Sequence, residues 1–495
     1  MHQATSGSAF VRLLGEWRRG SAPAYRELAD VVRLLILDGR LPLDSALPSE
    51  RTLALALGVS RTTVTAAYNA LREEGYLSAG QGTRARTSIP SRAGEEDPWA
   101  ARADYAPGLR APHGVVDFAY ACLPANGAAV HQAYTAALSE LPALLPGFGY
   151  DSYGLPELRE AIAAKFTAEG LPTTVDQVMV TGGAQQAMAL ALAAFVTPGS
   201  RVLVEHPSYP HALDAIGARQ CKAVPLAFPL TDGWDVDGFE AALARHRPAA
   251  AYLIPDFQNP TGRLMPAEQR RRVARAAAAS GTMLIADETL RDIDFDGTAP
   301  PHLGSYAPGV VTIGSLSKTH WGGLRIGWAR STAENIQRMA RARTPLDLGG
   351  PVAEQLAGRH ILQHDLPGLG PRLNELRGQR DTLLALLAEH LPEWRTEVPD
   401  GGLSVWCRLP RQGARGEAVS SAALTLLAAQ RGVRLAAGPR FGVGGAFEHF
   451  LRLPFTLPAG DLERGVLALK DAQAQLLRTP GLRRRLPEPP AVAIA

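Results

Sequence analysis

The sequence is poor in cysteine and has no long apolar run, and both absences exclude classes of protein. Cys122, Cys221 and Cys407 lie far apart in a chain of 495 residues, with no CxxC pair. Such spacing argues against a disulfide scaffold or a metal site and fits a reducing compartment. No stretch approaches 18 uninterrupted apolar residues, and the first thirty or so lack the apolar core of a signal peptide. We therefore expect a cytoplasmic protein without membrane insertion.

The chain also lacks a strong charge of either sign. Its 51 basic and 48 acidic residues give a formal net charge of +3, so any nucleic-acid surface must be local. Hydrophobic residues make up 46% and charged residues 20%, which is a globular composition and excludes a wholly disordered or fibrous chain. At roughly 150 residues per domain, the length predicts about two to four domains.

Composition divides the chain into four segments. Residues 20–87 have a compact helical pattern, and residues 88–114 are rich in Pro, Gly, Ser, Ala and charge, as a linker is. From 115 to 480, short β-branched runs such as RVLVE and TMLIAD alternate with Ala/Leu-rich stretches, and 481–495 has the composition of a tail. The alternation predicts a mostly parallel, doubly wound α/β sheet. The end of that segment mixes helices with short strands, which predicts a smaller α+β lobe.

The N-terminal segment has the spacing of three short helices. An apolar stripe from Tyr25 to Ile36 predicts the first helix, Ser49 is the expected N-cap of the second, and Gly58 suits the left-handed residue that ends it. Ser60 is the expected N-cap of a third helix, whose buried stripe is Val64, Ala67, Tyr68 and Leu71. Two short helices joined by a glycine turn form a helix-turn-helix, whose second helix reads base edges.

On pattern alone, a small helical bundle with a polar surface is an equal alternative. The run LPSERTLALALGVSRTTVTAAYNALREEGYL, however, resembles the GntR-type winged helix from Tyr25 to about Arg86. The resemblance implies DNA contacts from the second helix, from the start of the third helix and from the tip of a β-wing. The candidate DNA-binding residues are Arg51, Ser60, Arg61, Thr62, Thr63 and Thr65, with the wing tip at Gln81, Gly82 and Thr83.

Lysine is scarce, so a chemical role for this residue has four candidates: Lys165, Lys222, Lys318 and Lys470. Lys318 follows the apolar run VVTI, at a strand end where α/β sheets place their ligands. A lysine that loses hydration there becomes a nucleophile, best known for its Schiff base with pyridoxal phosphate. Asp287, at the end of TMLIAD, would keep the ring nitrogen of such a cofactor protonated. The alternative for Lys318 is an ordinary surface lysine, and the alternative for Asp287 is a helix N-cap.

Other pieces suit the same cofactor. The segment GGAQ follows the strand QVMV and opens a helix, whose free amides bind phosphate, although a tight structural turn is the simpler interpretation. Arg325 would add a bidentate phosphate contact. Tyr209 in EHPSYP can stack on a ring, and Asn259 in QNPTG can donate to a phenolic oxygen.

Taken in order, these pieces with YDSYGLPELREAIA, GLRIGW and LRLPF resemble the fold-type I aminotransferases. The resemblance implies that Lys318 forms the Schiff base, Asp287 pairs with the pyridinium, Asn259 donates to O3′ and Tyr209 stacks on the ring. It also assigns Ala184, Gln185, Ser315 and Arg325 to the phosphate, and Arg452 to the α-carboxylate of an effector. One position departs from the pattern, because Thr289 stands where related regulators usually carry a tyrosine. This departure argues against efficient transamination.

The two resemblances in one chain are the layout of the MocR/GabR-type regulators. This layout implies a multidomain, domain-swapped homodimer: a winged helix-turn-helix joined to a pyridoxal phosphate-dependent α/β domain. It implies a regulator that binds double-stranded operator DNA and senses a small amino compound, or the cofactor itself, through the internal aldimine at Lys318. Two rival hypotheses remain: a catalytically competent aminotransferase with an appended DNA-binding domain, and a structural use of the fold without cofactor.

Overall fold

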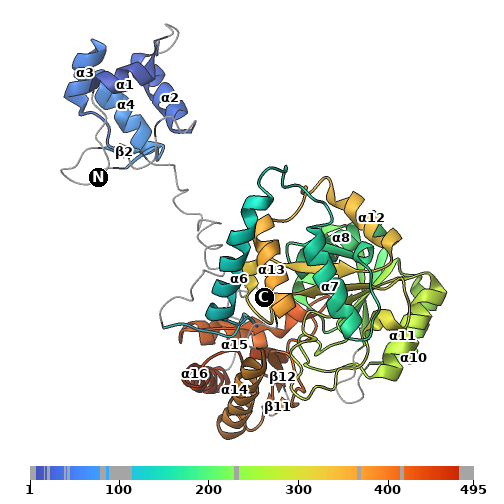
Figure 1. Ribbon diagram of the computed structural model, residues 1–495. Coiled ribbons are helices and arrows are strands. Elements are labelled where there is room, and N and C mark those ends of the chain that lie inside the picture. The colour runs from blue at the N-terminus through green and yellow to red at the C-terminus, as the bar shows by residue number, and fades with distance from the viewer. Residues whose placement is uncertain are drawn as a thin grey trace. The chain divides into compact units, whose positions relative to one another are not determined.

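The computed structural model describes residues 7–15, 17–18, 23–37, 41, 45–78, 85–87, 114–227, 234–364, 369–412 and 417–478. The chain divides into two compact units, Met1–Ala106 and Pro107–Ala495 (Figure 1). The expected linker, apart from Gly114, and the expected tail lie outside the described residues. The wing-tip residues Gln81, Gly82 and Thr83 lie outside them as well.

The N-terminal unit is a helical cluster with a short antiparallel β-hairpin. Its elements are α1 (Gly7–Leu14), α2 (Ala24–Leu37), α3 (Glu50–Leu57), α4 (Arg61–Glu73), β1 (Leu77–Ser78) and β2 (Arg86–Thr87). The predicted stripe of α4 is buried as expected. Phe10, Leu14 and Trp17, which precede the predicted start of the domain at residue 20, are buried in this unit's core. Phe10 and Leu14 bring α1 into the unit, and Trp17 follows this helix.

Local chemistry sets the helix ends around the turn between α3 and α4. The Ser49 side chain accepts a hydrogen bond from the Thr52 amide at 3.2 Å, and the Ser60 side chain accepts one from the Thr63 amide at 3.1 Å. Gly58 adopts the left-handed conformation, with φ 66° and ψ 31°, which is cheap only without a Cβ. The capped helix, glycine turn and capped helix predicted from the sequence are therefore confirmed.

The second unit is built on a seven-stranded sheet of order β4-β10-β9-β8-β7-β5-β6. The strands are β4 (Val178–Thr181), β5 (Arg201–His206), β6 (Lys222–Ala227), β7 (Ala250–Leu253), β8 (Met283–Asp287), β9 (Val311–Ser315) and β10 (Gly327–Arg330). All neighbours are parallel except β10, which runs antiparallel to β4 and β9. The predicted mostly parallel sheet is confirmed, and β6 and β10 are additions to the strands that the sequence indicated.

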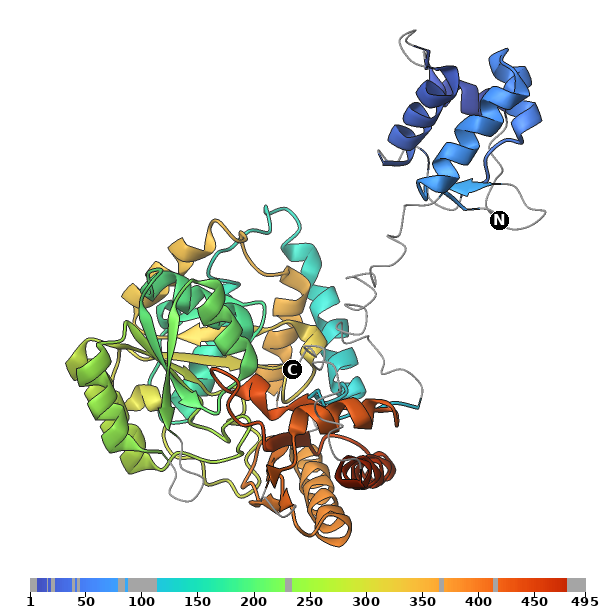
Figure 2. The same cartoon turned by 180° about the vertical axis from the view of Figure 1, so that it is seen from behind.

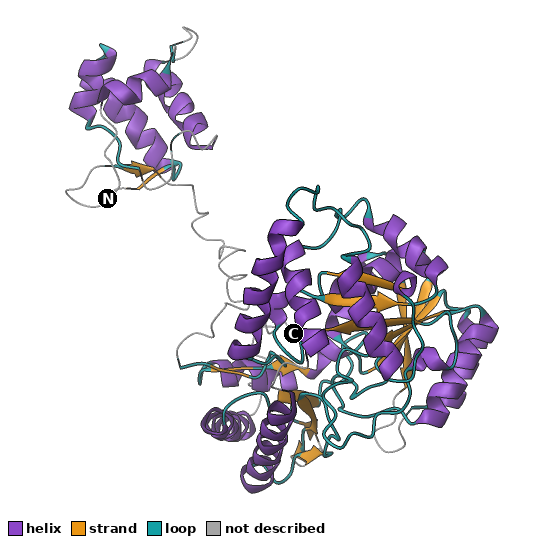
Figure 3. Ribbon diagram, viewed as in Figure 1, coloured by secondary structure: helices purple, strands orange, loops and turns teal. Residues whose placement is uncertain are grey.

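Helices cover both faces of this sheet, as Figure 3 shows, because its strands are apolar on both sides. They are α6 (Gly127–Glu140), α7 (Pro156–Ala168), α8 (Ala184–Phe195), α9 (Pro210–Ala218), α10 (Val236–His246), α11 (Ala267–Ser280), α12 (Ala333–Arg343) and α13 (Val352–His364). Along β5, Val202 and Val204 pack with α8, α9 and α12, whereas Leu203 packs with α10 and α11. In the view from behind, α10 and α11 are the neighbouring yellow-green helices beside the sheet (Figure 2).

The C-terminal lobe is the smaller α+β part that the sequence predicted. Its four-stranded antiparallel sheet has the order β11 (Arg395–Thr396), β12 (Ser404–Arg408), β17 (Phe450–Pro454) and β16 (Ala436–Ala437). The helices are α14 (Leu369–His390), α15 (Ser421–Ala429) and α16 (Ala459–Arg478), and β13 (Arg411–Gln412) pairs with β14 (Glu417–Ala418). β3 (Val116–Asp117) pairs with β15 (Val433–Arg434), so the start of the unit is held in this lobe. None of the helices in the described parts combines the length and apolarity needed to span a membrane.

Candidate functional site

The polar surface of α3 and α4 carries the predicted DNA contacts. Arg51, Ser60, Arg61 and Thr62 are exposed, and Thr63 is half-buried. The Ser60 hydroxyl lies 2.7 Å from the Thr62 hydroxyl and 2.8 Å from the Thr63 hydroxyl, so these three groups form one cluster at the start of α4. A helix start with exposed hydroxyls and a guanidinium is what base-edge and phosphate contacts require.

Glu50 is a residue of this surface that the sequence did not reveal. Its carboxylate accepts a hydrogen bond from the Thr65 hydroxyl at 2.9 Å, and lies 3.9 Å from Arg61 and 3.8 Å from Arg72. Thr65 is therefore turned toward α3. The exposed residues at the start of α4 are better placed to meet DNA.

The second unit contains a cavity of about 340 Å³ at the carboxyl ends of the strands of its sheet. Residues from loops after β4, β5, β7, β8 and β9 reach it, because parallel strands bring these loops to one edge. The predicted residues that line it are Ala184, Gln185, Tyr209, Asn259, Asp287, Lys318 and Arg325. Lining residues that the sequence did not single out for this site include Cys122, Met188, Ile254, Leu290 and Ser317.

One end of the cavity is a helix N-terminus beside a guanidinium. α8 begins at Ala184 after Gly183, whose φ is 92°, and the Nη2 of Arg325 donates to the Gly182 carbonyl. A Cβ built on Gly183 would lie 2.8 Å from Arg325, and one on Gly327 would lie 2.5 Å from the Gly183 carbonyl carbon. Both glycines are therefore needed for this close approach. The free amides and the arginine together suit a phosphate group.

Asp287 is oriented by two hydroxyl groups. Its Oδ2 accepts from the Tyr252 hydroxyl at 2.6 Å, and its Oδ1 accepts from the Thr289 amide at 3.1 Å and from the Thr289 hydroxyl. Burial raises the pKa of Tyr252 well above its usual value, and the negative charge of Asp287 adds to this shift. Tyr252 therefore remains a protonated donor. The sequence did not single out Tyr252.

Asn259 and Tyr209 lie on segments held together by a buried carboxyl. Glu205, at the end of β5, accepts from Trp234 Nε1 at 2.7 Å, from the Ile254 amide and from Gln258 Nε2 at 3.2 Å. Burial raises the pKa of Glu205 to about 8, although these donors act in the opposite direction.

Lys318 lies half-buried just past β9, with its amine facing the cavity wall. Nζ donates to the Ala121 carbonyl at 3.0 Å and lies 3.9 Å from the Cys122 sulfur. The Asn259 Oδ1 is buried and has no hydrogen-bond partner within the described part of the chain. A primary amine, a carboxylate at a strand end, a side-chain amide and a glycine-lined anion cradle are the groups that pyridoxal phosphate requires. The residues present therefore fit this cofactor.

Two predicted residues do not line the cavity. Ser315 is buried, and its hydroxyl donates to the Ile326 carbonyl at 2.9 Å and lies 2.8 Å from the Ser317 hydroxyl, so Ser317 is the serine at the cavity wall. Arg452 is fully buried on β17 and donates to the Ala119 carbonyl. Its assigned role and that of Ser315 stay predictions.

Arg452 nevertheless has unused binding capacity. Its Nε and Nη1 have no partner among the described residues, and its guanidinium carbon lies 5.3 Å from the centre of the Phe441 ring. Burial lowers the pKa of Arg452 to about 10, partly offset by Cys122 and Tyr209. Buried guanidinium donors are costly when unpaired, so this group is suited to an incoming acceptor.

Comparison with known proteins places both units in families. A model of the class I and II aminotransferases matches residues 147–469, and a model of the bacterial regulatory proteins of the gntR family matches residues 24–86. The chain is 33% identical to the 2-aminoadipate transaminase of Thermus thermophilus over 325 residues, which cover 63% of this chain and 79% of that protein.

A second relative matches nearly the whole chain. It is a Bacillus subtilis protein named as the uncharacterized HTH-type transcriptional regulator YisV, 26% identical over 506 residues, which cover 94% of this chain and 99% of that protein. Among solved structures, α-aminoadipate aminotransferase LysN from Thermus thermophilus, in complex with N-(5'-phosphopyridoxyl)-L-leucine, matches with a TM-score of 0.67 and 29% identity. The match covers 74% of this chain and 94% of that chain. The relatives thus include both a protein named as a transaminase and one named as an HTH-type transcriptional regulator.

Proposed function

Because the chain belongs to the class I and II aminotransferase family and carries a gntR-family domain, the architecture of the MocR/GabR-type regulators, we propose that it is a pyridoxal phosphate-dependent transcriptional regulator. Its binding to operator DNA responds to what occupies the Lys318 cavity. The observation that carries this proposal is the joining, in one chain, of an exposed DNA-reading helix and a cavity whose donors fit the cofactor. Such a protein works in the cytoplasm, where its DNA is.

Each residue of the cavity is assigned to a different part of the cofactor. Pyridoxal phosphate supplies an aldehyde that combines with primary amines. Lys318 offers such an amine, the amides at the start of α8 and Arg325 hold the phosphate, and Asp287 holds the ring nitrogen in its protonated form. Asn259 donates to the ring oxygen and Tyr209 covers the ring face. Tyr252 keeps Asp287 aimed at the cavity through its 2.6 Å hydrogen bond.

The effector is an amino compound, or the cofactor itself, and Arg452 favours one that carries a carboxylate. A carboxylate would satisfy the two unpartnered nitrogen atoms of this buried guanidinium. An effector shifts a conformational equilibrium only by its difference in affinity for the two states. That difference is typically about 1–3 kcal/mol, or about 5- to 150-fold in operator affinity.

The protein acts as a homodimer that pairs through its aminotransferase-like units. Large apolar side chains are exposed on α6 and on the loops that follow α6 and α12: Leu138, Leu145, Phe148, Tyr150, Leu346 and Leu348. The two loops lie side by side, because Gly349 approaches the backbone of Asp151. Apolar side chains of this kind favour a protein interface. We also propose the domain-swapped arrangement and the reading of two operator half-sites.

The test uses the purified full chain and the intergenic DNA beside its gene. We expect a cofactor absorbance band at about 420 nm, which Lys318→Ala removes. We also expect the operator affinity to change when the cofactor or a candidate amine is added. Arg61→Ala is expected to weaken operator binding and to lower the salt slope by about one unit, while keeping the band. A colourless protein that binds the operator equally with and without ligand would refute the sensor.

A catalytically competent aminotransferase with an appended DNA-binding domain is the second candidate. It is favoured by Lys318, Asp287, Asn259 and Arg325, which all line the cavity, and by the 33% identity to a transaminase. Thr289 disfavours it, because its hydroxyl donates to Asp287 and its short side chain replaces a phenol. Sustained amino-group transfer between an amino acid and a keto acid at more than about 1 per second would establish this function.

A further inference from the structure

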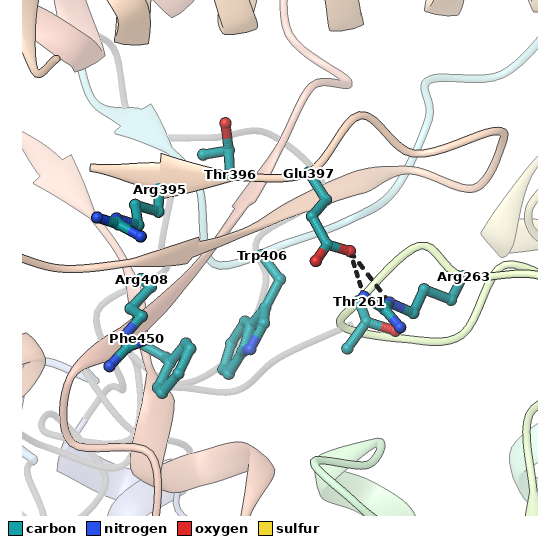
Figure 4. Close-up of a pocket in the computed structure, with 8 residues that line it drawn as sticks. All are labelled: Thr261, Arg263, Arg395, Thr396, Glu397, Trp406, Arg408 and Phe450. Atoms are coloured by element: carbon teal, nitrogen blue, oxygen red, sulfur yellow. Dashed lines mark hydrogen bonds and ion pairs between the residues drawn. The ribbon is translucent and has the colours of Figure 1, made fainter. Parts of the chain in front are cut away.

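A second cavity, of about 270 Å³, lies between the C-terminal sheet and the loop that follows β7. Figure 4 shows Arg395 and Arg408 on one side, Thr261, Arg263 and Glu397 on the other, and Trp406 between them. It shares no lining residue with the Lys318 cavity. Its volume is slightly below the range of drug-sized pockets, so it suits a small ligand.

Two arginines of this cavity lie opposite each other and have no carboxylate as an ion-pair partner among the described residues. Arg395 on β11 is paired directly with Arg408 on β12, and both side chains are exposed. Like charges in directly opposite positions destabilise a sheet. Within the described residues, no carboxylate forms an ion pair with either one. Arg263 across the cavity differs, because Glu397 accepts from it at 2.6 and 3.1 Å.

An aromatic wall adjoins the arginine pair. The Trp406 and Phe450 rings are stacked, with centroids 5.3 Å apart and planes at 8°. Trp406 is buried, and its Nε1 has no hydrogen-bond partner in the described part of the chain. Phe450 is paired directly with Arg408 across β12 and β17. A flat apolar surface therefore lies next to two guanidinium groups.

We propose that this cavity is a binding site for a small aromatic carboxylate. The carboxylate would bridge Arg395 and Arg408, which supply planar, bidentate donors matched to its two oxygens. The aromatic ring would lie along the face formed by Trp406 and Phe450. The bound anion would also relieve the repulsion between the two arginines.

The site is connected to the proposed effector arginine. Trp406 is paired directly with Arg452 across β12 and β17, and the Phe441 ring lies 5.4 Å from the Trp406 ring and 5.3 Å from the Arg452 guanidinium. A ligand that moved Trp406 would therefore act on Arg452 through these contacts. This regulatory role rests on the proposed function, whereas binding itself does not.

The experiment measures binding of indole-3-acetate and benzoate to the full chain by calorimetry, with indole, acetate and inorganic phosphate as comparison probes. We expect indole-3-acetate to bind, and Arg395→Gln and Arg408→Gln each to weaken it by about 10- to 100-fold, because each removes a charged hydrogen-bonding partner. Arg411→Gln, an exposed arginine of the same lobe, is the matched control and should leave binding unchanged. Lys318→Ala should also bind normally.

Equal binding of indole and indole-3-acetate, equal binding of phosphate and the aromatic acid, or unchanged affinity in Arg395→Gln/Arg408→Gln would overturn the site. Absence of heat with every probe would overturn it too. Binding lost in Lys318→Ala would show that the probe occupies the Lys318 cavity instead. If the site binds but operator affinity does not respond to indole-3-acetate, the aromatic-acid site stands and only its regulatory role fails.

Discussion

The buried carboxyl of Glu205 makes stability depend on pH in a way that can be calculated. Its oxygens face three N–H donors, from Trp234, Ile254 and Gln258, at the point where the segments carrying Tyr209 and Asn259 meet. Burial raises the pKa of Glu205 from its ordinary 4.5 to about 8 in the folded chain. An acid with a raised pKa binds a proton more tightly when folded, so its contribution to stability is complete at low pH and disappears as the pH rises through 8.

The magnitude follows from the two pKa values of this carboxyl. Proton binding to Glu205 contributes on the order of 1 kcal/mol to the free energy of unfolding at pH 7 and almost nothing at pH 9. Glu205→Gln cannot ionise and has no such term. We therefore expect the wild-type chain to lose on the order of 1 kcal/mol more stability than the variant between these two pH values.

Urea unfolding of the second unit, followed by tryptophan fluorescence at pH 7 and pH 9, measures this difference. Placing an amide beside three donors also lowers the stability of Glu205→Gln, but by an amount that does not depend on pH. This amount cancels, because each protein is compared with itself at the two pH values. Glu268→Gln, on the exposed start of α11, is the matched control and should keep the wild-type pH dependence. If Glu205→Gln loses as much stability as the wild type, Glu205 does not titrate in this range and the burial argument is wrong.

Three further predictions concern the helix cap, the phosphate cradle and a buried histidine. Ser60→Ala removes the N-cap of α4 and should destabilise the N-terminal unit by about 1 kcal/mol; an unchanged melting temperature would contradict this. Gly183→Ala should weaken cofactor binding in an absorbance titration by about tenfold or more, because its φ is 92° and its Cβ would meet Arg325; Ala184→Gly is the comparison. Burial lowers the pKa of His302, but hydrogen bonds to Glu169 and Glu288 outweigh it and raise the pKa overall. Its stabilisation is complete below about pH 6.5 and is lost as the pH rises through the raised value, so His302→Gln should flatten the fall in urea midpoint above about pH 6.5.

Local features of the fold were accessible from the sequence. Ser49, Gly58 and Ser60 act through hydrogen bonds and backbone angles within a few residues of themselves, so their spacing predicted the caps and the turn. Lys318 and Asp287 were accessible for a related reason. Each follows an apolar run, and parallel strands bring such positions to one edge of the sheet.

Features that depend on which strands become neighbours were not accessible. Tyr252 reaches Asp287 only because β7 pairs with β8 in a register that places Tyr252 opposite Ile285. Glu205 has the appearance of a surface charge at the end of RVLVEH, and only the packing of Trp234 and Gln258 shows that it is buried. The burial of Phe10 and its neighbours could not be predicted from the nearby sequence, because their packing partners lie on α2 and α3.

Thr289 illustrates how a single departure changes the chemistry of a pocket. Its hydroxyl donates to Asp287, so the proton it carries is already used within the protein. Tyr252 donates to the same carboxylate from the core, and neither hydroxyl is available to a ring oxygen in the cavity. Asn259, whose amide oxygen lacks a partner among the described residues, and Lys318 are left to contact such a ring and its amine. A pocket arranged in this way can hold a cofactor firmly and distinguish amines. Because it has fewer groups that can move protons, we propose that this pocket favours binding over turnover, as a sensor requires.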